Sequence, residues 1–181
     1  MKLLERLAIA VAAFVVAVAI IALLSGGLLA GRDTPGISGP ETGIGTVYRD
    51  LGHAHLRSGQ LRPRYDSQPP TSGAHVPVPV TRDQAAISDD ELLQALQSGD
   101  VVFMYAGPEI PAGLRALAAR IAPPFTPSRA AAGQAVILAR RPGTAGILGI
   151  GWTRLVRVSS AADPLLASFA RFALGRGAPS G

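Results

Sequence analysis

The sequence contains no cysteine, a single lysine, three histidines and few aromatic residues. The absence of cysteine excludes disulfide bonds, thiolate metal ligands and cysteine nucleophiles, and it leaves the redox compartment undecided. Charged residues make up only 16% of the chain and hydrophobic residues 48%, a balance that is not typical of a disordered protein. A length of 181 residues predicts one folded domain and one additional segment.

The positive charge of the chain is spread out. The net charge is +5, and nearly all of its basic residues are arginines that occur singly, apart from the pair Arg140 and Arg141. Nucleic-acid-binding proteins gather basic residues into patches, often with aromatic residues between them. We therefore expect no nucleic-acid partner, and a modest attraction to an anionic membrane surface or an acidic protein.

A long apolar run opens the chain. Residues 7–24 are 18 consecutive apolar residues, and the run continues with few interruptions to residue 30. A helix of this length covers about 27 to 36 Å, which is enough to cross the hydrocarbon core of a bilayer. A cleaved signal peptide is the alternative, but its apolar part is typically shorter, about 7 to 15 residues. The sequence therefore predicts a transmembrane anchor over residues 1–30.

The charges before this run predict an orientation. Lys2 and Arg6 favour a cytoplasmic N-terminus, so the rest of the chain would lie on the periplasmic or extracellular side of an inner membrane. Residues 31–46 are rich in glycine, proline, serine and threonine, which is typical of a flexible linker. We expect this linker to lead into a domain over residues 47–175, followed by a frayed tail over residues 176–181.

The expected domain alternates short strand-like and helix-like segments. Ser88 and Glu91 form a capping box before an apolar stripe at helical spacing, which predicts a helix ending at Gly99. Strands are predicted over residues 47–56, 101–106, 135–139 and 147–158, further helices over 111–122 and 160–174, and a loop over 125–133. We expect Gly149 and Gly151 to let the last strand segment bend. The order predicts a small α+β fold with a mixed or mostly antiparallel sheet of about four or five strands and about three helices.

A proline-rich loop precedes the first predicted helix. Its two adjacent prolines fix two φ angles, and the following Thr-Ser-Gly supplies two hydroxyl groups and a residue that tolerates positive φ. The pattern predicts a rigid loop that orients the imidazole of His75. The residues of this signature loop are Tyr65, Pro69, Pro70, Thr71, Ser72 and Gly73.

All three histidines lie between residues 53 and 75. If residues 47–56 form a strand, His53 and His55 share one face, because side chains alternate along a strand. Three imidazoles can hold zinc or copper and leave a position open for water. Two interpretations remain open: a loop-built site that collects His53, His55 and His75, or a stiff turn with a surface histidine.

Residues 69–75 (PPTSGAH) resemble the Pro-Pro-Thr-Ser-Gly-Pro-His signature of the bacterial domain of unknown function 3105 family. The resemblance covers about residues 50–175. It includes the block from Ser88 to Tyr105, where the family has an acidic helix start, the motif His-Asn-Leu-Glu-His-Gly and an apolar strand that ends in tyrosine. His55 lies where the family often has a His-Val pair. The activity of this family is not established, so the resemblance implies a fold more than a function.

The chain departs from the family motif at its ionisable positions. Where the family reads His, Glu and His, this sequence has Gln94, Gln97 and Ser98. On a helix these positions share one face, so the family motif resembles a helix-borne metal cluster. Amide and hydroxyl groups are weak ligands for zinc or copper, so the resemblance implies that the ligand set is incomplete here.

Two functions from different classes follow. We expect a non-catalytic, membrane-tethered domain that serves as an accessory or interaction subunit on another membrane or periplasmic protein and needs no cofactor. The alternative is an extracytoplasmic domain that binds zinc or copper through His53, His55 and His75. The sequence favours no enzymatic activity, because no nucleophile elbow is present and Ser72, His75 and Asp66 lie on one local loop.

Overall fold

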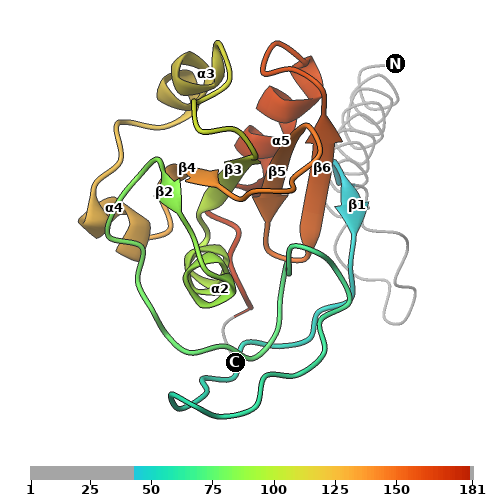
Figure 1. Ribbon diagram of the computed structural model, residues 1–181, viewed down its shortest axis with the longest axis vertical. Helices are drawn as coiled ribbons and strands as arrows, with labels where there is room; N and C mark the ends of the chain where they lie inside the picture. The colour runs from blue at the N-terminus through green and yellow to red at the C-terminus, as the bar shows by residue number, and fades with distance from the viewer. Residues whose placement is uncertain (1–42, 180–181) are drawn as a thin grey trace, which may run out of the picture. The chain divides into compact units, whose positions relative to one another are not determined.

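The hydrophobic run after Gly99 forms the central strand, β3 (Val101–Tyr105), and all five of its residues are buried. β3 pairs in parallel with β4 (Val136–Arg140) and antiparallel with β5 (Ile147–Gly151), which pairs in turn with β6 (Arg154–Val158). Two-residue strands, β1 (Thr46–Val47) and β2 (Ala85–Ala86), form the edges of the sheet (Figure 1). The strand order is β1-β6-β5-β3-β4-β2.

The computed structural model describes residues 43–179. These residues also form four helices, α2 (Asp89–Ser98), α3 (Leu114–Ile121), α4 (Pro127–Ala131) and α5 (Pro164–Ala173). The expected anchor over residues 1–30 and most of the expected linker lie outside the described residues. Within residues 43–179, no helix is both long and apolar enough to cross a membrane.

The sheet has a hydrophobic core on each face. On one face, alternate residues of β3 such as Phe103 pack with residues of α3 and α5, including Leu117 and Phe169. On the other face, Met104 and its neighbours pack with α2, and Ala130 of α4 joins this cluster. Because side chains alternate along a strand, an uninterrupted apolar strand can serve both cores at once.

The α+β class and the mixed sheet are confirmed, because three strand pairs are antiparallel and two are parallel. The expected numbers of strands and helices were too low. The described residues form six strands, because residues 147–158 contain two strands and because β2, with only two residues, carries too little pattern to predict. The expected loop over residues 125–133 contains α4, which Thr126 caps by accepting a hydrogen bond from the backbone N–H of Arg129 at 3.2 Å.

The segment over residues 147–158 is a hairpin, and its break differs from the predicted one. The chain turns at Trp152 and Thr153, where Thr153 has a φ of 57°. Gly149 and Gly151 lie within the continuous strand β5 rather than at the break. They lie under α5, where a Cβ atom on Gly149 would meet Leu166 and Phe169 at 2.9 Å. These glycines therefore allow the helix to approach the sheet closely.

The prediction of a strand over residues 47–56 was wrong. Only Thr46 and Val47 form a strand, and His53 and His55 do not share a strand face. The reason is that side chains, rather than a neighbouring strand, take up the backbone donors here: Arg49 N–H donates to Asp66 and Leu51 N–H to Ser72, each at 3.0 Å. Residues 48–84 therefore form a long irregular segment, apart from a single bridge between His55 and His75.

The tail after α5 is not frayed over residues 176–179. Gly175 N–H donates to the carbonyl of Gly99 at 2.8 Å, and Ala178 N–H donates to the carbonyl of Gln97 at 3.0 Å. Ala178 also packs against the core on the α2 side of the sheet. The tail therefore satisfies carbonyl groups at the end of α2, which otherwise lack helical partners.

Candidate functional site

Helix α2 begins with the capping box that the sequence predicts. Ser88 Oγ accepts a hydrogen bond from Glu91 N–H at 3.2 Å, and the Glu91 carboxylate accepts one from Ser88 N–H at 2.9 Å. At the other end, Gly99 has a φ of 110°, and its N–H bonds to carbonyls in the last turn. The helix is thereby fixed at both ends beside the irregular segment over residues 48–84.

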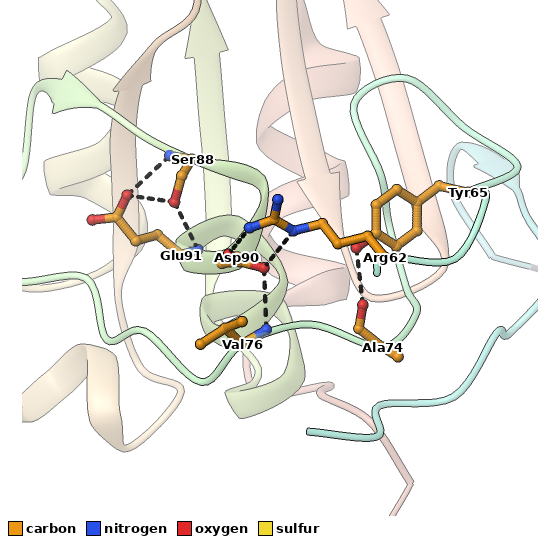
Figure 2. A network of polar contacts seen from close by, with 7 residues as sticks. All are labelled: Arg62, Tyr65, Ala74, Val76, Ser88, Asp90 and Glu91. Atoms are coloured by element: carbon orange, nitrogen blue, oxygen red, sulfur yellow. Dashed lines mark hydrogen bonds and ion pairs between the residues drawn. The ribbon is translucent and has the colours of Figure 1, made fainter. Parts of the chain in front are cut away.

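Asp90 joins this segment to the first turn of α2 (Figure 2). Its carboxylate accepts a hydrogen bond from Val76 N–H at 3.1 Å and forms an ion pair with Arg62, whose Nε lies 3.2 Å from Oδ1. The hydrogen bond from Arg62, together with that from Val76, outweighs burial and lowers the pKa of Asp90 below its usual value. The sequence indicates only that an acidic residue here favours the helix N-terminus. The tertiary partners of Asp90 carry no local signal.

The signature loop holds separate segments of the chain together. Ser72 Oγ accepts from Leu51 N–H at 3.0 Å and donates to the Arg49 carbonyl at 3.1 Å. The carbonyl of Thr71 accepts a hydrogen bond from Thr153 N–H at 3.0 Å, which ties the loop to the β5–β6 turn. Thr71 and Ser72 are fully buried, so both residues are closely packed on all sides. The Thr-Ser part of the signature therefore joins three separate segments of chain.

Tyr65 and Gly73 fix the conformation of the signature loop. Gly73 has a φ of 127°, and a Cβ atom there would meet the Tyr65 ring at 2.8 Å. The Tyr65 hydroxyl donates to the carbonyl of Ala74 at 2.9 Å (Figure 2). Pro69 and Pro70 are buried, and the bond between Gln68 and Pro69 is cis. Glycine is needed here for two reasons, the positive φ and the ring that lies against it.

His75 and His55 lie together. Their backbones form a parallel bridge, and their rings meet edge to face with centroids 5.5 Å apart. His75 is 0% exposed, which excludes the surface-histidine interpretation. Its Nδ1 lies 3.0 Å from the carbonyl of Gly73, so Nδ1 carries the proton and Nε2 presents a lone pair. That buried Nε2 has no hydrogen-bond partner among the described residues.

The family-motif positions on α2 lie beside this pair. The Nε2 of His55 donates to the amide oxygen of Gln97 at 3.1 Å. Gln94 and Ser98 line a cavity of about 300 Å³ together with His55. The Ser98 hydroxyl donates to the backbone carbonyl of Gln94 at 3.1 Å. The structure therefore brings Gln94, Gln97 and Ser98 together around His55.

His53 is not grouped with the other two histidines. Its ring packs edge-on against Trp152, with centroids 6.1 Å apart. Within residues 43–179, no three histidine, cysteine, aspartate or glutamate side chains are close enough together to hold a metal ion. Zinc sites use three or four strong protein ligands, and His55 and His75 supply two. Gln97 and Ser98 are weak ligands, so the donor set does not match that of a zinc site.

Asp100 is a further member of the site that the sequence does not reveal. It follows α2, lines the same cavity and is 1% exposed. One carboxyl oxygen accepts a hydrogen bond from Ala135 N–H at 2.8 Å, and the other has no partner among the described residues. Burial raises the pKa of Asp100 to about 7, and the bond from Ala135 only partly opposes it. Its one sequence signal is a single acidic residue between an apolar helix and an apolar strand.

The fold and site together define a class of protein. It is a mixed α+β domain whose long irregular segment is fastened to one helix, with two histidines and a cavity at the junction. The chain belongs to the family described as "Protein of unknown function (DUF3105)", whose sequence model matches residues 58–180. Neither the curated proteins nor the solved structures contain a match to this chain.

Proposed function

We propose that this protein is a non-catalytic, single-pass membrane-anchored domain that acts outside the cytoplasm as an accessory or interaction subunit on another membrane protein. The apolar run over residues 7–24 supports the anchor, and Lys2 and Arg6 support the orientation. The lack of a nucleophile elbow in the sequence supports a non-catalytic role.

The observation that carries the interaction role is the loop over residues 57–64. In this loop Leu61 is 93% exposed, and Arg57, Arg62 and Arg64 are exposed as well. A leucine this exposed stands apart from the cores on both faces of the sheet. Burying it in a partner is worth about 1.5 to 3 kcal/mol. An exposed apolar side chain in a loop with several arginines fits a partner surface with an apolar pocket and an acidic rim.

The loop is held in place before any partner binds. Gln60 N–H donates to the carbonyl of Arg57, and Arg57 N–H donates to the side chain of Gln60, each at 3.0 Å. Arg62 remains 53% exposed while its guanidinium pairs with Asp90 on α2. A preorganised loop loses less entropy on binding than a mobile one. This favours a docking role for the exposed Leu61.

The test compares two exposed leucines. The full chain is purified from solubilised membranes as wild type, as Leu61→Ser and as Leu165→Ser, because Leu165 is 43% exposed on α5. We expect a stoichiometric complex with wild type and Leu165→Ser, and at least about a tenfold loss of partner with Leu61→Ser. A chain that always elutes alone contradicts the proposal, as does equal recovery with both variants. If wild type binds anionic vesicles rather than a protein, and Leu61→Ser loses that binding, the loop binds lipid instead.

A transition-metal site is the second candidate. The observation that favours it is the buried, unpartnered Nε2 of His75 beside the ring of His55. Zinc or copper held by this pair would need further ligands from water or a partner. Metal content of the purified full chain tests it: stoichiometric zinc or copper that is lost in His75→Ala supports the site. Absence of both metals after titration and dialysis excludes it.

A further inference from the structure

The cavity beside His55 has a lining of two kinds. Its apolar wall is formed by Pro77, Pro79 and Val80 of the irregular segment, by Ala95 of α2 and by Ala130 and Ala131 of α4. Its polar residues are His55, Gln94, Ser98 and Asp100. A volume of about 300 Å³ suits a small organic molecule.

Two buried oxygen acceptors of the cavity residues lack a donor within residues 43–179. The buried amide oxygen of Gln94 and one carboxyl oxygen of Asp100 have no hydrogen-bond partner among the described residues. The hydroxyl proton of Ser98 is already given to a backbone carbonyl, and His55 gives its Nε2 proton to Gln97. Buried acceptors without donors are costly, so these two oxygens favour a ligand that supplies donors.

The carboxyl group of Asp100 distinguishes a cationic donor from a neutral one. The ion pairs of the described residues involve Arg62 with Asp90 and Arg141 with Asp89, and neither reaches Asp100. A cation placed here would supply both the missing charge and the missing hydrogen bond. We propose that this cavity binds a small molecule with a primary ammonium group and a short apolar body. The site goes beyond the interaction role, because no residue of the loop over residues 57–64 lines this cavity.

Binding of such a ligand has a proton signature. An ammonium group beside Asp100 favours the ionised carboxylate, so it lowers the pKa of Asp100 from about 7 and releases a fraction of a proton at neutral pH. Asp100 accepts a hydrogen bond from the backbone N–H of Ala135, and the polar residues His55, Gln94 and Ser98 line the same cavity. Acidification through pH 6 protonates Asp100 and weakens the binding.

The experiment uses n-butylammonium as the probe and n-butanol as its neutral counterpart. Calorimetric titration of the full chain in detergent, in two buffers of different ionisation enthalpy, measures affinity and proton release together. We expect butylammonium to bind in the millimolar range, at least about tenfold tighter than butanol, with proton release at pH 7. Equal binding of the two probes, tighter binding of acetate, or no binding at about 100 mM would overturn the proposal.

Two variants and one control locate the probe. Asp100→Asn keeps an oxygen for Ala135 and removes the charge, so butylammonium should bind at least about tenfold more weakly and without proton release. Ala131→Leu fills the cavity from the exposed end of α4 and should weaken binding while Asp100 still titrates. Glu109→Gln removes an exposed acid outside this cavity and should change nothing. Equal effects of Asp100→Asn and Glu109→Gln would mean that the probe follows net charge alone.

Discussion

At the scale of single residues, Asp90 holds the irregular segment to α2. Asp90→Ala would leave Val76 N–H without its acceptor and break the pair with the half-exposed Arg62, and we expect it to lower the free energy of unfolding by about 1.5 to 3 kcal/mol. Asp89→Ala is the matched control. Its ion pair with Arg141 is partly exposed and worth about 1 kcal/mol or less. Urea denaturation at pH 7 measures both, and equal midpoints for the two variants would refute this role.

Asp100 should give stability the opposite dependence on pH from Asp90. The pKa of Asp90 is lower in the folded state, so its contribution is present above about pH 4 and is lost as the pH falls further. The pKa of Asp100 is raised to about 7, so the folded state binds an extra proton between about pH 4 and 7. As the pH rises from about 4 to 7, we expect Asp100 to lower the free energy of unfolding by at most about 4 kcal/mol. Asp100→Asn should remove this slope in thermal melts, and an unchanged slope would contradict it.

The residues that could be predicted from the sequence are those with local partners. The capping box of Ser88 and Glu91 needs only a spacing of three residues, and it is present. Asp90 and Asp100 bond to Val76 and Ala135, which are 14 and 35 residues away in the sequence. Such partners are set by the tertiary fold, so neither spacing nor composition reveals them.

At the scale of elements, α5 packs directly on the glycines of β5. We expect Gly149→Ala to destabilise the protein by about 1 to 3 kcal/mol, because its Cβ would lie 2.9 Å from Leu166, Phe169 and Val156. Gly107→Ala is the control, since the nearest atom to its Cβ would lie at 3.6 Å. Thermal unfolding measured for both variants checks the prediction. A Gly149→Ala protein as stable as the control would show that α5 shifts without cost.

The elements that the sequence predicts well have complete local patterns. The helix after Ser88 has a cap, an apolar stripe and a terminal glycine, and the strand after it is uninterruptedly apolar. The strand expected over residues 47–56 fails because Asp66 and Ser72 take its backbone donors. At the candidate site, the placing of His55 and His75 side by side depends on that irregular segment, so the strand-based grouping with His53 was wrong.

At the scale of the whole molecule, the α+β class follows from the order of the elements, whereas the strand order does not. β1 and β2 are consecutive strands in the sequence, yet they lie at opposite edges of the sheet (Figure 1). Only two residues of each strand are paired, and the connection between them is irregular. No hydrophobic periodicity marks such a crossing, because its backbone is held by side chains that are distant in the sequence.

This crossing has a consequence for the order in which the protein folds. The four longer strands come from the contiguous stretch over residues 101–158, so the middle of the sheet can form before residues 48–84 are laid across it. We expect the amides of Leu56, Gly73 and His75 to exchange with solvent deuterium faster than that of Phe103, which lies in the central strand. Native-state exchange followed by mass spectrometry measures this, and equal protection would contradict it. The histidine pair is then assembled last and released first, so it can open and close while the sheet beneath it stays folded.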